Sequence, residues 1–218
     1  MGAGGGTVSN SYSIGNVTGE WQYVGGLVGF SDYFGTVSNC YATGSVTGGS
    51  EVGGLMGYND GTVSTSYSAG NVTGDSRVGG LMGYNDGTVS TSYSTGSVTG
   101  ATVVGGLVGA GGGTVSNSYS IGNVTGNEYI GGLVGFSYGG SVTNSFWNTQ
   151  TSGQATSAGG TGKNTTEMQD FDTFTDTETE GLDESWDIIA VDDPGDRNTG
   201  YIWNIVDDVT YPFLSWQP

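Results

Sequence analysis

A repeat with a period of about 26 residues fills the first two-thirds of the chain. Its most regular part reads Gly-Thr-Val-Ser-x-Ser-Tyr-Ser-x-Gly-x-Val-Thr-Gly, and Gly-Gly-Leu-(Val/Met)-Gly follows in phase. The opening tripeptide (Gly-Ser-Val in the last copy) starts at Gly6, Gly35, Gly61, Gly87, Gly113 and Gly140, in steps of 29, 26, 26, 26 and 27 residues. Short β-forming runs divided by glycine at such a period are typical of stacked-repeat architectures.

Each repeat contains three runs of strand-forming residues, which in the first copy are residues 7–13, 16–18 and 24–29. Runs this short, bounded by glycine or Asn-Asp-Gly, predict strands joined by turns. No single repeat can bury an apolar face, whereas stacking one repeat per turn completes the backbone hydrogen bonds of every strand. The sequence therefore predicts an all-β fold. We expect a β-solenoid (β-helix) of about five 26-residue, three-strand coils over residues 1–148.

The inward-facing residues are partly readable from the repeat. Columns that recur almost unchanged are expected in the core, and they are represented in the first copy by Val8, Tyr12, Val17 and Leu27. Strand alternation then turns Ser9, Ser11 and Ser13 outward. The opposite phase stays open, because the serine columns also accept Cys40 and Ala42 and so prefer small residues. Cys40 stands where the other copies have serine, which predicts a small buried residue rather than a reactive thiol.

Two insertions enlarge the first full coil, at residues 19–24 and 30–34. They contain aromatic residues that the repeat itself does not need, namely Trp21, Tyr23, Tyr33 and Phe34. Insertions in a solenoid form loops, and loops on a rigid scaffold often carry recognition. These four residues are therefore a candidate ligand-binding surface. The alternative is that they shield the edge of a coil.

The repeat pattern ends after residue 148. Residues 149–166 are rich in Ser, Thr and Gly and are expected to form a linker or an irregular cover. Residues 167–218 hold most of the acidic residues of the chain together with three tryptophans. This mixture is too aromatic for a disordered acidic tail. We expect an irregular C-terminal cap whose aromatic residues cover the last coil and whose charges discourage edge-to-edge pairing.

The repeat resembles the GLUG repeat of bacterial and archaeal surface proteins, over residues 2 to about 148. The tail, with Trp186-Asp187 and Ile202-Trp203, is similar to what often follows such repeats. The resemblance implies an extracellular, cell-surface location and an adhesive role, and it implies no catalytic residue. Residues 2–19 repeat residues 109–126, so the chain opens within a coil. This predicts a fragment of a longer protein or a coil that expects a neighbour.

Charge and composition exclude several classes of function. The chain has 21 Asp and Glu against 3 Lys and Arg, a formal net charge of −18. Such a surface repels phosphates and anionic lipids, so we expect neither nucleic acid nor a membrane as partner. No apolar run is long enough for a transmembrane helix. Without histidine and with one cysteine, neither a His/Cys zinc site nor a Ser-His-Asp triad can be assembled, and we expect no catalysis.

Three further groups of residues have a possible chemistry. Oxygen ligands at alternate positions suggest a calcium loop, the one cofactor that we consider, and they are Asp192, Asp193, Asp196 and Asn198. Glycosylation sequons occur at Asn16, Asn71, Asn123 and Asn164. A solvated loop is the alternative explanation for the calcium-loop residues. A polar strand position is the alternative explanation for the sequons. Asp60 and Asp86 share one column before a glycine, which favours turn chemistry over a catalytic pair.

The sequence thus predicts a non-catalytic extracellular module, a cell-surface adhesin or structural repeat, whose partner is a surface glycan or protein. The main alternative is a self-assembling subunit of an extracellular fibre or sheath, stacked coil on coil with identical subunits. A third hypothesis is ice binding through the column of Thr18, Thr47, Thr73, Thr99 and Thr125. A flat ice-binding face needs two parallel threonine files, and the companion column mixes Asn and Ser.

Overall fold

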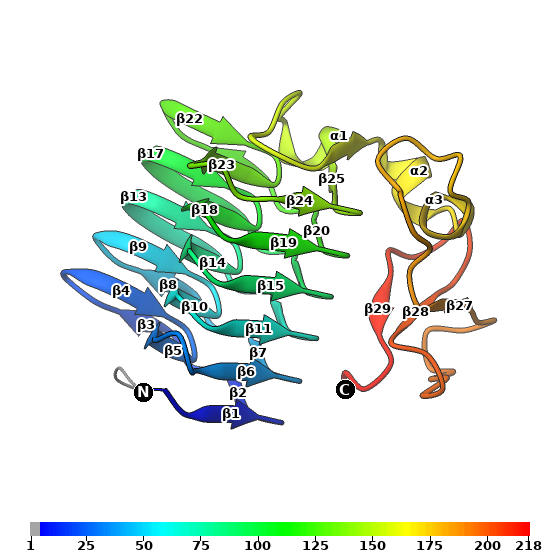
Figure 1. The fold of residues 1–218 in the computed structure, drawn as a ribbon, viewed down its shortest axis with the longest axis horizontal. Coiled ribbons are helices and arrows are strands. Elements are labelled where there is room, and N and C mark those ends of the chain that lie inside the picture. The colour runs from blue at the N-terminus through cyan, green and yellow to red at the C-terminus, as the bar shows by residue number, and fades with distance from the viewer. Residues whose placement is uncertain (1–4) are drawn as a thin grey trace.

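The repeat region is a β-solenoid of about five coils with about 26 residues in each, as the sequence predicts. The computed structural model describes residues 5–218. Figure 1 shows the coils stacked one above another. Strands of successive coils pair in parallel and in register, so that Val63 lies opposite Val37 of the previous coil and Val89 of the next. Four parallel sheets run along the stack.

The sheets take their strands from successive parts of each repeat. The first sheet contains β1 (Thr7–Ser9), β6 (Thr36–Ser38), β11 (Thr62–Ser64), β15 (Thr88–Ser90), β19 (Thr114–Ser116) and β24 (Val142–Thr143). The second contains β2 (Tyr12–Ser13), β7 (Tyr41–Ala42), β12 (Tyr67–Ser68), β16 (Tyr93–Ser94), β20 (Tyr119–Ser120), β25 (Phe146–Asn148) and β26 (Thr161–Lys163).

The other two sheets form the wide lobe at the left of Figure 1. The third sheet contains β3 (Val17–Thr18), β8 (Val46–Thr47), β13 (Val72–Gly79), β17 (Val98–Gly105) and β21 (Val124–Thr125), with β4 (Gln22–Gly25), β9 (Ser50–Gly53) and β22 (Glu128–Gly131) beside them. The fourth contains β5 (Val28–Ser31), β10 (Met56–Asn59), β14 (Met82–Asn85), β18 (Val108–Gly111) and β23 (Val134–Ser137).

Each coil has more corners than the three predicted strands require. The run over residues 7–13 breaks between β1 and β2, where Asn10 has φ 48°, and the run over residues 24–29 breaks at Gly26. A left-handed residue turns the chain sharply within one position. At the glycine pairs the coils touch: a Cβ on Gly80 would lie 2.1 Å from the Gly106 carbonyl oxygen. A side chain at these pairs would therefore clash with the neighbouring coil.

The left-handed corner also decides which side chains face inward. The valine column of the first sheet and the leucines that follow the glycine pairs are buried, as predicted, and the Val17 column packs in a second core within the lobe. The prediction for the second sheet is wrong. Its tyrosines face outward and its serines inward, because the residue at the corner interrupts strand alternation between Val8 and Ser11.

The inward serines form a hydrogen-bonded ladder at the corner between the first and second sheets. Ser66, Ser92, Ser118 and Ser145 are fully buried. Each of these hydroxyls donates to the carbonyl two residues earlier and accepts the backbone N–H of the equivalent residue one coil before, at 3.1–3.2 Å. Cys40 occupies the same column, with its Sγ 3.1 Å from the Ser38 carbonyl oxygen, and burial raises the pKa of its thiol. It is the small buried residue that the sequence predicts.

The outward tyrosines form a stacked ladder. Neighbouring rings of Tyr12, Tyr41, Tyr67, Tyr93 and Tyr119 lie 5.0–5.1 Å apart and within 7° of parallel. Apart from Tyr12, whose side chain is 61% exposed, the ladder is covered by the C-terminal region. Offset aromatic stacking of this kind adds to the energy of burial.

Residues 149–163 cover the last coil. They include α1 (Thr149–Ser152) and β26, which pairs with β25, and the Ala158 N–H donates to the Val134 carbonyl. The sequence predicts a linker or an irregular cover for residues 149–166, and the structure corresponds to the cover. Because this end of the stack is covered, coil-on-coil growth of a fibre would lack an open rung here.

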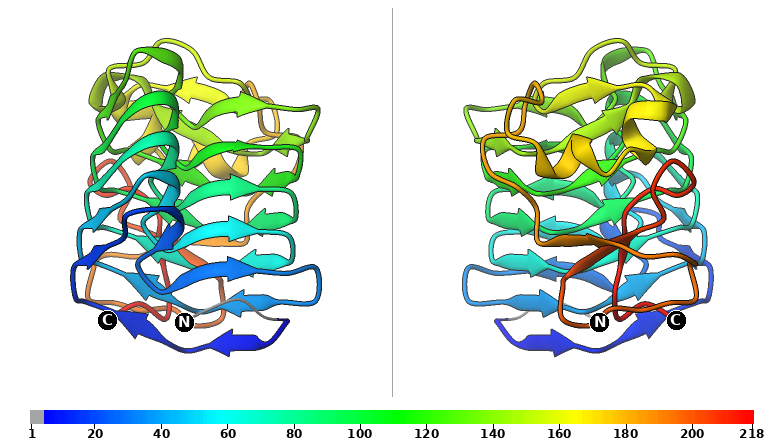
Figure 2. Two further views of the ribbon diagram at one scale, coloured as in Figure 1. Left: turned by 90° about the vertical axis from the view of Figure 1, so that its left-hand side faces the viewer. Right: turned by 90° about the vertical axis from the view of Figure 1, so that its right-hand side faces the viewer.

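The remaining C-terminal residues lie along the side of the solenoid and not over its end. They contain α2 (Thr165–Gln169), α3 (Asp172–Thr175), β27 (Ile188–Ala190), β28 (Trp203–Ile205) and β29 (Phe213–Leu214). Figures 1 and 2 show this layer running beside the coils from the last to the first. Trp203 lies 5.8 Å from the Tyr93 and Tyr119 rings, and Trp216 lies 6.0 Å from Tyr67. The predicted position over the last coil is corrected accordingly: the layer contacts that coil at its side, and the apolar surface that it covers is the tyrosine ladder. No helix within residues 5–218 is long and apolar enough to cross a membrane.

The corner residues allow a stability prediction. Asn39 and Asn117 adopt φ of 52° and 46°, whereas the same column has the β-branched Thr65 and Thr91 at 48° and 51°. Asn tolerates this region and a β-branched residue does not. We expect Thr65→Asn to raise the free energy of unfolding by about 1 kcal/mol in urea denaturation. The reverse change, Asn117→Thr, should lower it by a similar amount, and equal stabilities would show that the corner is unstrained.

The tyrosine ladder predicts a loss of stability in alkali. Burial, then the neighbouring Tyr41, raises the pKa of Tyr67 to about 12, and burial also raises the pKa of Tyr119 well above its ordinary value. Folding therefore favours the neutral phenols. This stabilisation is complete below the unfolded tyrosine pKa of about 10 and is lost as the pH rises towards 12. We expect the midpoint of thermal unfolding to fall over this range, and less steeply in Tyr67→Phe. A midpoint independent of pH would contradict the burial of these hydroxyls.

Candidate functional site

A groove lies where the fourth sheet turns into the first. In three successive coils this turn reads Asp60-Gly61-Thr62, Asp86-Gly87-Thr88 and Gly112-Gly113-Thr114. These residues and Tyr33 line a hollow of about 440 Å³. The turns repeat at the spacing of one coil, about 4.8 Å, so the groove runs along the stack and presents a Gly-Thr pair at every coil, with an aspartate before it in two of the three.

The floor of the groove has no side chains because the coils approach too closely there. A Cβ on Gly61 would lie 2.2 Å from the Gly35 carbonyl oxygen, and one on Gly87 would lie 2.1 Å from that of Gly61. Both distances are far below van der Waals contact. The turns themselves are held by asparagines at the ends of β10 and β14: Asn59 accepts the Gly61 N–H and donates to Asn85 Oδ1 at 2.8 Å. The floor is consequently rigid.

The two carboxylates of the groove differ in their partners. Asp86 Oδ1 accepts the Gly112 N–H at 3.0 Å, and its Oδ2 accepts the Tyr58 hydroxyl at 3.3 Å. The half-buried side chain of Asp60 accepts no hydrogen bond from the residues that the structure describes. Asp86 is thus part of the turn structure, in keeping with the predicted turn chemistry, whereas the Asp60 carboxylate is not engaged by any residue that the structure describes.

An aromatic strip borders the groove on the fourth sheet. Phe30, Tyr58 and Tyr84 stack at 5.1–5.2 Å, and Tyr23 lies against Tyr58 at 5.4 Å. Burial, then the charges of Asp86 and Asp60, raises the pKa of Tyr58 to about 12. The Tyr58 hydroxyl therefore stays protonated and donates to Asp86 throughout the neutral range, which links the strip to the groove.

A charged pair lies at the outer edge of this strip. Arg77 forms a salt bridge with Glu51 and lies over the Tyr84 ring at 5.5 Å. Glu51 is buried, and its second oxygen has no hydrogen-bond partner within residues 5–218. The Arg77 charge is thus engaged by Glu51 and Tyr84, and it does not line the groove.

The structure separates the four aromatic residues that the sequence predicts as a binding surface. Tyr33 is 73% exposed and lines the groove, with Phe34 edge-on beside it at 5.3 Å. Tyr23 belongs to the aromatic strip. Trp21 is 79% exposed between β3 and β4 and does not line the groove. The sequence assigns Asp60 to turn chemistry and does not single out Thr62, although the repeated Asn-Asp-Gly-Thr is a signal for both.

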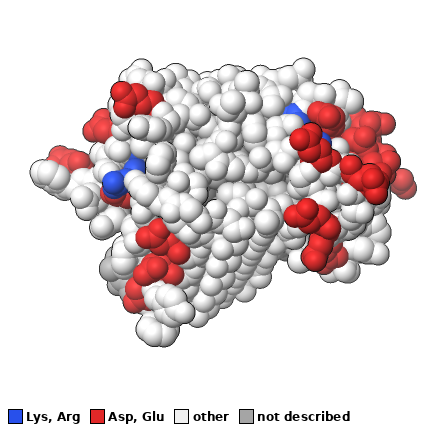
Figure 3. Space-filling view, turned by 45° about the horizontal axis from the view of Figure 1, so that its top comes forward, with Lys and Arg blue, Asp and Glu red and all other residues white. Residues whose placement is uncertain are grey.

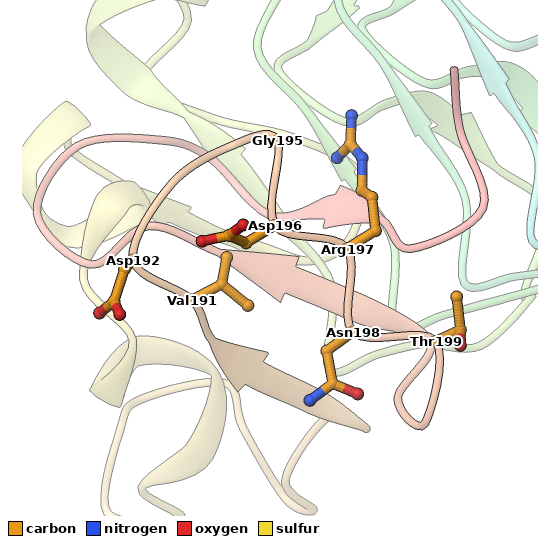
Figure 4. A pocket seen from close by; sticks show the side chains of 7 residues that line it. All are labelled: Val191, Asp192, Gly195, Asp196, Arg197, Asn198 and Thr199. Atoms are coloured by element: carbon orange, nitrogen blue, oxygen red, sulfur yellow. The ribbon is translucent and has the colours of Figure 1, made fainter.

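The predicted calcium loop lies between β27 and β28. Figure 4 shows that the side chains of Asp192, Asp196 and Asn198 point in different directions around a hollow of about 530 Å³. Asp193 accepts the Gly195 N–H and Asn198 accepts the Gly200 N–H, so both oxygens hold turns. Within residues 5–218 no group of three His, Cys, Asp or Glu side chains could hold a metal ion. Calcium binding stays a prediction that this geometry does not support.

The predicted glycosylation sites are all exposed. Asn16 and Asn71 use their Oδ1 atoms to accept the N–H of Ser45 and Ser97, one coil on, and Asn164 Oδ1 caps α2. Asn123 instead donates to Thr125. Asn16, Asn71 and Asn164 thus use the side-chain oxygen and leave the nitrogen, which would carry a glycan, without a role in these contacts. Glycosylation stays a prediction.

Hydroxyl groups cover the first and third sheets. The Thr18 column is exposed on the third sheet beside Asn and Ser, as expected. The first sheet has a more regular array, since valine faces inward and the residues on both sides of it face outward. Its two files are Thr36, Thr62, Thr88 and Thr114, and Ser38, Ser64, Ser90 and Ser116. Figure 3 shows acidic residues gathered at two sides of the molecule, with an uncharged surface of parallel rows between them.

Comparison with known proteins gives a family match in two parts of the repeat region. The family model described as the GLUG motif matches residues 22–47 and 126–146. The first matched span begins in β4 and ends in β8, and the same strand order continues in register through the coils between the two spans. Neither a curated protein nor a solved structure matches the chain.

Proposed function

We infer that this GLUG-repeat solenoid is a non-catalytic module that binds a glycan at a cell surface. The observation that carries the proposal is the groove beside Tyr33. There an exposed aromatic ring, an unpartnered carboxylate and a row of threonine hydroxyls lie over a rigid glycine floor. The extracellular location belongs to the proposal and is supported by the kind of repeat.

The chemistry of the groove suits a sugar chain. Pyranose rings pack one apolar face against an aromatic ring and direct their hydroxyls sideways, where Asp60 and the threonines can exchange hydrogen bonds with them. A few well-placed polar groups beside an aromatic surface are typical of small-molecule sites. Tyr33 comes from the insertion after β5, and in solenoids such insertions lie on the binding face. The repeated turns match a ligand that is itself a repeating polymer.

Binding is favoured over hydrolysis by the state of the carboxylates. A glycosidase needs two carboxylates beside the scissile bond, one as acid and one as base or nucleophile, and we assign Asp86 a role in the turn instead. Both oxygens of Asp86 already accept hydrogen bonds, from Gly112 and Tyr58. Asp60 alone does not provide the pair.

The proposal is tested by removing the ring at the groove. We expect Tyr33→Ala to weaken binding at least 10-fold (about 1.4 kcal/mol) in a glycan array followed by calorimetry with the best binder. Trp21→Ala is the matched control, because Trp21 is an equally exposed aromatic residue of the same coil outside the groove. Equal loss in both variants would place recognition elsewhere, and no binding to any glycan would refute the proposed function.

The two hydroxyl files of the first sheet favour ice binding as a second candidate. Files on neighbouring coils repeat at about 4.8 Å, and positions two residues apart on a strand are separated by about 6.6 Å, so the hydroxyls form a planar lattice. If this face binds ice, the protein at micromolar concentration should reshape growing ice crystals, and Ser64→Tyr should abolish the effect. Tyr33→Ala should leave it unchanged. Normal crystal growth with the unmodified protein would exclude this candidate.

A further inference from the structure

The groove beside Tyr33 is negatively charged, and within residues 5–218 its lining contains no cationic side chain. Asp60 and Asp86 are its two charged residues, and none of its lining residues is Lys or Arg. The chain as a whole has 3 Lys and Arg, and Arg77 at the edge of the adjoining aromatic strip is paired with Glu51. A ligand in this groove therefore meets a negative potential that the protein does not neutralise.

Asp60 is the carboxylate of the groove that lies open to an incoming donor. Its side chain is half-buried at the groove wall, and no described residue donates a hydrogen bond to it. A carboxylate that is open to solvent can accept hydrogen bonds from a ligand, and a cationic donor forms the stronger bond. An ammonium group offers three N–H donors and a compensating charge. A carboxylate or sulfate group would be repelled at the same position.

The shape of the groove favours a sugar polymer over a basic peptide as the source of the ammonium group. Tyr33 provides a ring face for a pyranose next to Asp60. The three turns of the floor repeat the Gly-Thr pair at each coil step of about 4.8 Å, whereas an extended peptide advances about 3.3 Å per residue and does not keep step with the turns.

We propose that the groove binds an amine-bearing polysaccharide, one that contains unacetylated hexosamine units, with a sugar ring on Tyr33 and its ammonium group at Asp60. This inference rests on the proposed glycan-binding function and adds the chemical class of the ligand. It excludes uronic-acid and sulfated polymers as ligands of this groove.

The test compares three soluble probes by calorimetry with the full chain: a glucosamine hexamer, its N-acetylated counterpart and a uronic-acid hexamer. We expect the glucosamine hexamer to bind at least 10-fold more tightly than the acetylated one, and the uronic-acid hexamer not to bind. Asp60→Asn should remove the preference while binding of the acetylated hexamer persists. Asp75→Asn, which changes an exposed acid outside the groove, should leave the preference intact.

The outcomes separate this inference from the function on which it rests. Equal binding of the free and acetylated hexamers would overturn the inference and leave glycan binding standing. Binding of no oligosaccharide would overturn both. If hexalysine bound as tightly as the glucosamine hexamer and still bound to Tyr33→Ala, the groove would be a site for basic peptides, and the inference would be wrong. Because the interaction is ionic, the preference should shrink as NaCl is raised.

Discussion

The register between coils is the constraint on which the structure depends. Each strand completes its hydrogen bonds with the equivalent strand of the next coil, so residues one repeat apart lie directly over one another. Any residue type in a column must then be able to pack against a copy of itself. Valine, leucine and glycine do this by shape. Serine and tyrosine do it by chemistry, since a hydroxyl both donates and accepts and aromatic rings stack.

This constraint explains why the solenoid was readable from sequence and why some details were not. The period, the turns and the valine and leucine columns follow from one repeat considered alone. The orientation of Tyr12 does not, because it depends on the left-handed corner at Asn10, where either asparagine or threonine occurs in the other coils. The inward orientation of Tyr12 was predicted by continuing the strand alternation from Val8 through Asn10, where the left-handed corner interrupts that alternation.

The site and the C-terminal layer were hard to predict because both consist of contacts between segments distant in sequence. Tyr33 was recognisable as an insertion, but its partner Asp60 lies in the next coil and comes from an ordinary turn. The aromatic residues of the tail were recognisable as a cover. What they cover could be known only after the tyrosines were placed on the outside of the coils, where Trp203 and Trp216 meet them.

The C-terminal layer also has a mechanical consequence. It touches the last coil through Trp186, which lies 6.1 Å from Phe146, and it reaches Tyr41 of an early coil through Trp216 at 6.3 Å. A force that pulled the coils apart along the stack would load this layer in parallel with the strands between the coils. The layer therefore ties the early coils to the last one, and the coils cannot separate one by one until its aromatic contacts have slid or detached.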